Sequence, residues 1–568
     1  MELQRSILLG ALLVIAALLW QAWDTQQLHQ QARQHQTAQA GQATTSSDNN
    51  SVPAVNVGEH EQAQSMTSAK QAMPTSVLVS EPENFIRVDT KSLHLIIDRR
   101  GGNVIDARLP LYPVSLEKPD VPFQIFSHQP GQSYIARSGL VSSMGPDTIT
   151  GGQVVFSSAK QKYTLASGEN RIVVPLTWQS SDGIVIKKTF TIPADAYHID
   201  VAYDITNNSQ QVWSGHAYHE ILRAHPPKPG WMAFHTFTGA AFSTPDSPYN
   251  KLSFEKMAQE NLSKSVTGGW IAMMEHYFLS AWVPNHQQQS HFYTRQLNDN
   301  QFAIGMIGPT LQVKPGQSLT TRTSLYVGPA IPKHLAALAP HLDLTVDYGI
   351  LWWIASPIMK LMTLIYQFTG NWGWAIILVT LIIKLLFYKL SATSYRSMAK
   401  MREMQPKMQA IKERYGDDKE KMTKATMELY KEAKLNPLSG CLPILIQIPV
   451  FLSLYWVLLE SVEFRQAPFI FWIQDLSSRD PYFVLPILMG ISMFLQQKMS
   501  PTPPDPMQAK MMMMLPLVFT LFFLHFPSGL VLYWLTNNLI SIAQQWYITK
   551  SVERDNGKNR RASKQRST

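Results

Sequence analysis

A lysine, Lys384, lies inside the apolar segment 372–391, which reads WGWAIILVTLIIKLLFYKLS. A segment of this length can cross a bilayer, and a central lysine costs about 2.5–3.5 kcal/mol on insertion scales. Such a residue usually faces a wet cavity or a partner. Thr380 and Tyr388 each lie four residues from Lys384, which predicts that the three side chains stack along one face of a helix. The spacing therefore predicts a polar, positively charged site inside a membrane-spanning helix.

Polar side chains on later apolar segments could complete this site. The candidates are Gln447, Ser453, Thr520, Tyr533, Trp534, Thr536, Asn537 and Asn538, of which we assign Gln447, Tyr533, Trp534 and Asn537 to the site. No Asp or Glu lies inside these segments, so we expect water to be the partner of Lys384. Two other interpretations stay open. Small polar side chains often tie membrane helices together or bond their own backbone, and Lys384 could snorkel to the interface beside Lys389.

Apolar segments predict six transmembrane helices. Residues 1–23 suit both a retained anchor and a cleaved secretory signal, and we favour the anchor because no clear A-x-A cleavage site follows. The other spans are 371–391 and four within 437–548, at roughly 438–459, 481–498, 511–526 and 529–548. The basic segments 392–436 and 549–568 are then cytoplasmic, together with both termini, as the positive-inside rule requires.

The exported part is expected to be a linker followed by an all-β domain. Residues 24–80 are rich in Gln, Ala, Ser and Thr and predict a flexible periplasmic linker. From 81 to 340, short alternating runs such as HIDVAYDI predict a sandwich of many antiparallel strands. One cluster there, His216, His219 and Glu220 with Asp195 and His198 upstream, could form a sugar or metal site. Because no H-E-x-x-H or comparable spacing occurs, surface and turn histidines are the simpler interpretation.

Segment 341–370 mixes Trp, Tyr and aliphatic residues with charged ones and an internal Pro357. This composition is typical of an amphipathic helix that lies along the membrane interface. The alternative is that 349–369 spans the membrane.

Segment 392–436 predicts a cytoplasmic helical hairpin that turns at Gly416, Asp417 and Asp418. Its first arm carries methionines near helical spacing, at Met398, Met401, Met404 and Met408. Methionine adapts to varied apolar partners, so these residues could capture a substrate. Packing between the two arms explains the pattern equally well.

Composition excludes several functions for this chain of 568 residues. Its net charge of +9 comes from lysines and arginines beside apolar spans, which favours topology signals over nucleic-acid binding. The lone cysteine, Cys441, excludes an intramolecular disulfide and a cysteine-based zinc cluster. No nucleotide motif and no ionisable relay of a coupled transporter is present, so we expect no catalytic residue, cofactor, metal or small-molecule substrate.

Several long motifs resemble the YidC family of membrane protein insertases. They include GNWGW (370–374), SMAKMREMQPKMQAIKERYGDDKEKM (397–422), NPLSGCLPILIQIPVF (436–451), FRQAPFIFWIQDLSSRDPY (464–482) and FPSGLVLYW (526–534). The resemblance implies a five-helix insertase core and, from the layout, a Gram-negative form with a periplasmic β-supersandwich. It also implies a role in placing nascent proteins in the bacterial inner membrane, alone or with the Sec translocon. One departure is that Lys384 stands where the family characteristically has arginine, and Lys389 where proline is common.

On this basis, we expect the hairpin and the basic tail to meet the ribosome and the nascent chain. The substrate's polar tail would then enter the site near Lys384, while its apolar segment slides past Ile448 and Phe451 into lipid. The alternatives are a small-molecule transporter and a carbohydrate-binding protein that acts through its β domain.

Overall fold

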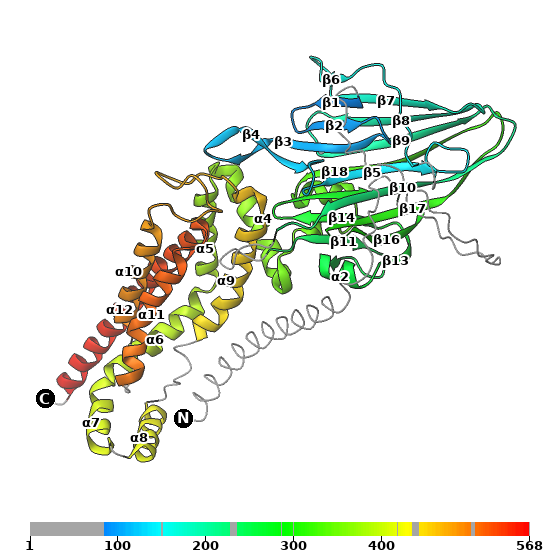
Figure 1. The fold of residues 1–568 in the computed structure, drawn as a ribbon. Coiled ribbons are helices and arrows are strands. Elements are labelled where there is room, and N and C mark those ends of the chain that lie inside the picture. Colours follow the sequence, from blue (N-terminus) through cyan, green and yellow to red (C-terminus); the bar gives the residue numbers. More distant parts are fainter. Residues whose placement is uncertain are drawn as a thin grey trace.

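The computed structural model describes residues 84–148, 152–227, 236–285, 287–298, 300–416, 418–433, 442–500 and 506–566. The predicted anchor 1–23 and linker 24–80 lie outside these ranges. A β-rich region occupies one end of the molecule and a helical region the other (Figure 1). The two regions meet at residues 340–350, close to the boundary that the sequence predicts.

Two large sheets make up the β-rich region. The ten-stranded sheet runs in the order β13-β16-β17-β10-β5-β3-β2-β1-β6, and β4 pairs with β3. Its strands are β1 Phe85–Asp89, β2 His94–Asp98, β3 Asn103–Ser115, β4 Lys118–Phe126, β5 Tyr134–Val141, β6 Lys162–Thr164, β10 Trp213–Ala224, β13 Ser263–Thr267, β16 Gln289–Asn298 and β17 Gln301–Val313. All the strand pairs are antiparallel except β1 with β6.

The eight-stranded sheet runs β12-β11-β14-β15-β18-β9-β8-β7 and is antiparallel throughout. Its strands are β7 Arg171–Gln179, β8 Ile184–Pro193, β9 His198–Asn207, β11 Gly239–Ser243, β12 Asn250–Leu252, β14 Trp270–Glu275, β15 Phe278–Val283 and β18 Ser318–Pro329. The inner faces of the two sheets bury Trp213, Trp270 and Trp282 almost completely. The alternating runs in the sequence therefore predicted a largely β-sheet domain, and this is confirmed.

Short helices connect the β-rich region to the helical region. They are α3 Pro332–Leu338, η2 Leu342–Thr345 and η3 Gly349–Leu351, whereas α2 Phe254–Gln259 lies within the β-rich region between β12 and β13. Side chains also join the regions directly: Arg465 donates to the carbonyl oxygens of Pro113 at 2.7 Å and Val114 at 3.2 Å, and His276 Nε2 donates to the Leu459 oxygen at 2.7 Å.

The helical region consists of the helices α4 Trp352–Thr369, α5 Trp372–Leu386, α6 Tyr388–Glu403, α7 Gln405–Tyr415, α8 Lys419–Glu432, α9 Leu442–Glu460, α10 Val484–Met499, α11 Pro506–Phe523 and α12 Ser528–Arg566, with the 3-10 turn η5 Val462–Phe464. The helices α7 and α8 lie at the end farthest from the β-rich region (Figure 1). Asp418 caps α8 by accepting from the backbone nitrogens of Glu420 and Lys421, as predicted for the turn at Gly416.

Within the described residues, few helices meet the length and composition expected of a membrane span. Residues 349–369 are long and apolar enough to cross a membrane, and α5 with α6 satisfies the same criterion only as a pair bent by 70°. The apolar parts of α9, α10 and α11 are shorter. Whether α4 spans the membrane or lies along its surface therefore stays a prediction.

Helix contacts in this region are close. A Cβ atom added at Gly490 of α10 would lie 2.0 Å from Thr520 Oγ1 of α11, so a small residue is required at this contact. The helix α12 continues to Arg566, so the basic segment after residue 548 extends the last helix, and its cytoplasmic placement stays a prediction.

Candidate functional site

Lys384 of α5 is buried between three helices, with 7% of its surface exposed. Its Nζ donates to Gln447 Oε1 of α9 at 3.3 Å and to Ser541 Oγ of α12 at 2.8 Å. These partners are protein oxygens, whereas the sequence predicted water. The structure does not show the snorkelling alternative, because the ammonium group is buried and bonds to Gln447 and Ser541.

The partners of Lys384 are themselves joined by hydrogen bonds. Gln447 Nε2 donates to Asn537 Oδ1, and Ser541 Oγ donates to the Asn537 backbone oxygen at 2.7 Å. All three are neutral, and no ion pair of Lys384 occurs within the described ranges. The site therefore solvates a positive charge by dipoles without neutralising it, which leaves the charge available to an incoming anion.

A small cavity adjoins the ammonium group. Its volume is about 30 Å³, measured as the space open to the centre of a water-sized sphere, which holds one or two water molecules. Its walls are Thr380, Ile383, Lys384, Phe387, Leu390, Ser391, Gln447, Val450, Tyr533 and Asn537. Five of the seven predicted site residues thus lie together. The space that they surround is smaller than the water-filled site that the sequence predicts.

The predicted stack along one helix is interrupted. Thr380 lines the cavity, but its hydroxyl donates to the Ile376 backbone oxygen at 2.6 Å, which is the backbone-bonding alternative. The helix ends at Leu386, and the chain bends by 70° before α6 begins at Tyr388. Tyr388 is 37% exposed and does not line the cavity, so the prediction that it stacks with Lys384 is wrong.

Trp534, the other predicted residue outside the cavity, packs in an aromatic cluster. Its ring lies 4.7 Å from Phe451 and 5.1 Å from Phe523, measured between ring centroids. Phe451 is therefore half-buried against neighbouring helices, whereas Ile448, one turn earlier on α9, is 46% exposed. Of the two predicted sliding contacts, Ile448 is the more accessible.

The predicted capture methionines do not share one helix. Met398 and Met401 lie on α6, Met404 lies at the break before α7, and Met408 on α7 accepts a hydrogen bond from Tyr430 at 3.5 Å. All four are half-buried. Strongly exposed methionines occur instead at the start of α11, at Met507, Met511, Met513 and Met514.

Ser541, which makes the shorter of the two hydrogen bonds to Lys384, is not among the predicted site residues. A signal was present, because Ser541 lies four residues after Asn537 and therefore on the same helix face.

The histidine cluster of the β domain contains buried structural residues. His219 and Glu220 lie on β10 with 4% and 0% of their surfaces exposed, so the interpretation as surface or turn residues is wrong for both. Asp195 pairs with Lys91 at 3.5 Å. No group of three or more metal-ligating side chains occurs in the part of the chain that the structure describes. His219 and Glu220 therefore offer no open face to a sugar or a metal, whereas Asp195 is exposed and His198 and His216 are half-buried.

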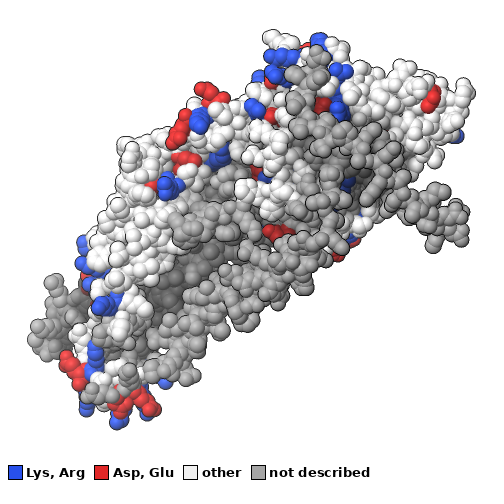
Figure 2. Space-filling view, viewed as in Figure 1, with Lys and Arg blue, Asp and Glu red and all other residues white. Residues whose placement is uncertain are grey.

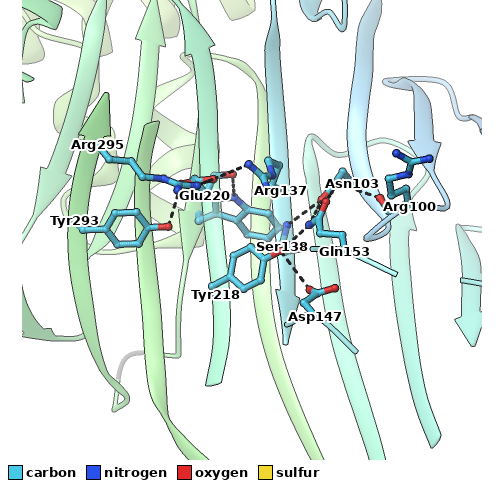
Figure 3. A network of polar contacts seen from close by, with 11 residues as sticks. Arg100, Asn103, Arg137, Ser138, Asp147, Gln153, Tyr218, Glu220, Tyr293 and Arg295 are labelled. Atoms are coloured by element: carbon cyan, nitrogen blue, oxygen red, sulfur yellow. Dashed lines mark hydrogen bonds and ion pairs between the residues drawn. The ribbon is translucent and has the colours of Figure 1, made fainter. Parts of the chain in front are cut away.

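Glu220 is the centre of a polar network across the ten-stranded sheet (Figure 3). Its carboxylate accepts from Arg295 at 2.7 and 3.0 Å and from the Tyr293 hydroxyl at 3.1 Å, and Arg137 lies 3.4 Å away. Burial would raise the pKa of Glu220, but the charges of Arg295 and Arg137 outweigh burial and lower it. The network holds strands β5, β10, β16 and β17 together.

Comparisons with known proteins match both regions of the chain. The family described as "YidC periplasmic domain" matches residues 85–361, and the family described as "60Kd inner membrane protein" matches residues 364–556. A membrane protein insertase YidC from Stutzerimonas stutzeri is 48% identical, over 97% of this chain and 99% of the relative. One from Legionella pneumophila is 47% identical, over 97% of each chain.

This chain belongs to the YidC family. A crystal structure of an active YidC insertase is also similar, at 20% identity and a TM-score of 0.38, over 82% of this chain and 92% of that one. The β-rich region is the family's periplasmic domain, and the helical region is its inner-membrane part. The relatives are named as insertases, which is not an enzymatic activity.

The periplasmic domain of this YidC family member is expected to show a pH dependence that His219 controls. Burial lowers the pKa of His219 to about 3, and its Nε2 has no hydrogen-bond partner among the described residues. Between pH 6.5 and 3 the unfolded chain therefore binds a proton that the folded domain does not, so His219 costs stability as pH falls. From pH 6.5 to 5 the cost is about 2 kcal/mol.

The variant His219→Phe keeps an aromatic ring at this position, where the His219 and Trp282 ring centroids lie 4.8 Å apart, and removes the imidazole that titrates. Burial raises the pKa of Asp147 to about 6, which favours the folded state in acid, so the two chains must be compared at each pH. We expect the variant to gain about 2 kcal/mol relative to the parent between pH 7 and pH 5. Pulse proteolysis in urea measures the free energy of unfolding of each chain at each pH. If the variant gains no stability relative to the parent between pH 7 and pH 5, His219 does not control the pH dependence.

Proposed function

We propose that this chain is a membrane protein insertase, which places nascent proteins in the bacterial inner membrane and assists their folding. The observation that carries the proposal is the buried, un-neutralised ammonium group of Lys384, solvated by Gln447 and Ser541. The names of full-length relatives at 47–48% identity support it.

The topology that we propose has six transmembrane helices, with both termini and α7–α8 in the cytoplasm. Charged side chains gather at the α7–α8 end and at the junction with the periplasmic domain, and a mostly uncharged surface lies between them (Figure 2). This distribution is typical of a protein that crosses a bilayer between its two polar ends. The basic residues near α7 and α8 support cytoplasmic placement of that end.

Short membrane helices lower the barrier that a substrate must cross. The helix α5 has 15 residues and α10 has 16, so they are about 22 and 24 Å long. The hydrocarbon core of a typical bilayer is about 30 Å thick. A bilayer that adapts to such helices becomes thinner around them.

The first step of the mechanism is recognition of a polar, often acidic, substrate tail. A carboxylate that reaches Lys384 replaces hydrogen bonds to two neutral acceptors with a hydrogen bond in which both the donor and the acceptor are charged. The 30 Å³ cavity is too small for a peptide, so α9 or α12 must move to admit the tail. The released Gln447 and Ser541 can then bond the substrate backbone.

The second step is transfer of the substrate's apolar segment to lipid. Apolar side chains that are exposed on α9 and α11, which include Ile448, Met511 and Leu517, offer contacts to this segment. Burial in lipid drives this step, at roughly 25 cal/mol per Å² of apolar surface. No ATP is required.

Partners follow from the same mechanism. The nascent chain and the ribosome meet the basic α7–α8 end, and membrane lipids surround the apolar band. Sec translocon components are proposed as partners of the periplasmic domain or of the membrane helices.

Site-specific photocrosslinking to a stalled nascent membrane protein tests the proposal. A crosslinker at Thr380 or Ile448 is expected to capture the nascent chain in the membrane fraction. The matched control is Leu488 on α10, which is apolar and 44% exposed but not part of the site. Equal capture at all three positions, or no capture at Thr380 and Ile448, would mean that the nascent chain does not pass along the Lys384 site.

A further inference from the structure

A second, larger cavity lies where the periplasmic domain meets the membrane helices. Its volume is about 290 Å³, by the same measure as above. Its walls come from strands β12, β14 and β15 of the periplasmic domain, from the connection before α4, and from the last turns of α9. The cavity is unrelated to Lys384, since the two sets of lining residues have no member in common.

The polar groups in this cavity are mainly acceptors. Lys251 forms an ion pair with Asp347, and Arg223 forms one with Glu275, so these four charges cancel in pairs. Glu460 also lines the cavity and has neither an ion pair nor a hydrogen bond among the described residues. One carboxyl group is therefore left over. Burial and the charge of Asp347 raise its pKa to about 7, and a bound cation would favour its ionised form.

His276 does not supply the missing positive charge. Burial lowers the pKa of His276 to about 4, so the ring is neutral at pH 7. Its Nε2–H donates to the Leu459 backbone oxygen, which leaves Nδ1 as one more acceptor. An occupant with several N–H donors and a positive charge fits this set of acceptors.

Aromatic rings complete the site. Phe237, Tyr277, Phe278 and Trp456 all line the cavity. Lys251 Nζ already lies 5.0 Å from the Phe237 ring centroid, so a cation over an aromatic ring is an arrangement that this wall accommodates. A second ammonium group would gain the same type of interaction.

The position of the cavity indicates where the cation comes from. Glu460 is the last residue of α9, and Gly349 lies three residues before Trp352; Trp352 and Trp353 are 60% and 61% exposed. Exposed tryptophans at a helix end are typical of the lipid headgroup zone. The cavity therefore lies at the depth of the periplasmic headgroups.

We propose that this cavity binds the ammonium headgroup of an aminophospholipid from the periplasmic leaflet, with Glu460 as its carboxylate partner and Trp456 as an aromatic wall. The bound headgroup would join the periplasmic domain to the membrane surface at the junction of β14, β15 and α9. The proposal concerns lipid binding and holds whether or not insertion proceeds through Lys384.

Native mass spectrometry of the full chain in detergent tests the proposal. The probes are dioleoylphosphatidylethanolamine, its N-acetylated derivative, which lacks the ammonium charge, and free ethanolamine. We expect the chain to retain the ethanolamine lipid about tenfold more strongly than the N-acetylated lipid. Equal retention would overturn the proposal, and free ethanolamine that binds as tightly as the lipid would overturn the assignment to a lipid.

The variant Glu460→Gln locates the selectivity. It removes the carboxylate charge at nearly constant shape and is expected to abolish the tenfold preference. The control Glu117→Gln makes the same change on the exposed β3–β4 turn and is expected to keep it. If Glu460→Gln does not fold, Trp456→Leu, which retains the carboxylate, should reduce the preference severalfold. An unchanged preference in the folded cavity variants would overturn the proposal.

Discussion

Replacing Lys384 with glutamate is expected to abolish insertion of substrates that carry an acidic N-terminal tail. Two unit charges 4 Å apart interact by about 4 kcal/mol at an effective dielectric constant of 20, and the substitution changes this attraction into repulsion. Such a reversal reduces the insertion rate by well over tenfold. The measurement is protease protection of the translocated tail in proteoliposomes that contain the purified variant.

Matched variants separate charge from structure. Lys384→Arg should retain most of the activity, because arginine keeps the positive charge and can donate to Gln447 and Ser541. Lys389→Glu makes the same charge change on the exposed surface of α6 and should have little effect. The Lys384→Glu chain must also reach the membrane at normal levels. If it does and inserts acidic-tailed substrates at the parent rate, the electrostatic role of Lys384 is wrong.

The membrane site was largely predictable because burying a charge in a membrane costs free energy. A charge inside an apolar segment requires polar neighbours, so polar side chains on the later apolar segments, Gln447 and Asn537 among them, could be named as candidates. The bend at Phe387 could not be predicted, because neither proline nor glycine lies there. Local sequence thus predicted that Lys384 needs partners, whereas the packing of α5 against α12 determines which partners it has.

The periplasmic domain shows the same division between local and long-range information. Alternation in GIVIKKTFTI predicts that one of two adjacent lysines faces inward, and Lys188 is fully buried. Its Nζ donates to the backbone oxygens of Gly101, Gly102 and Ser138 at 2.8–2.9 Å. These acceptors lie 50 to 87 residues away in the sequence, and nothing in the strand pattern identifies them. Sequence periodicity predicts the strands but not the partners that make a buried charge tolerable.

Removing the carboxylate of Glu220 is expected to destabilise the periplasmic domain more than any surface substitution. Glu220→Ala leaves Arg137 and Arg295 without their shared counter-charge, and Arg137 is only 1% exposed. Breaking a buried ion pair by removing one partner costs about 3–5 kcal/mol. Because β10 is central in its sheet, this loss lowers the free energy of the opening that exposes its amides.

Hydrogen exchange of the β10 amides in the purified full chain measures this loss directly. Their exchange should accelerate by roughly two to four orders of magnitude in Glu220→Ala, as a loss of 3–5 kcal/mol requires. Glu220→Gln keeps acceptors for Arg295 and Tyr293 and should have a smaller effect. The exposed control Glu117→Ala should exchange like the parent chain. If the β10 amides of Glu220→Ala exchange at the same rate as those of the parent chain, the two arginines find other acceptors or water. The network of Figure 3 would then not hold the sheet together.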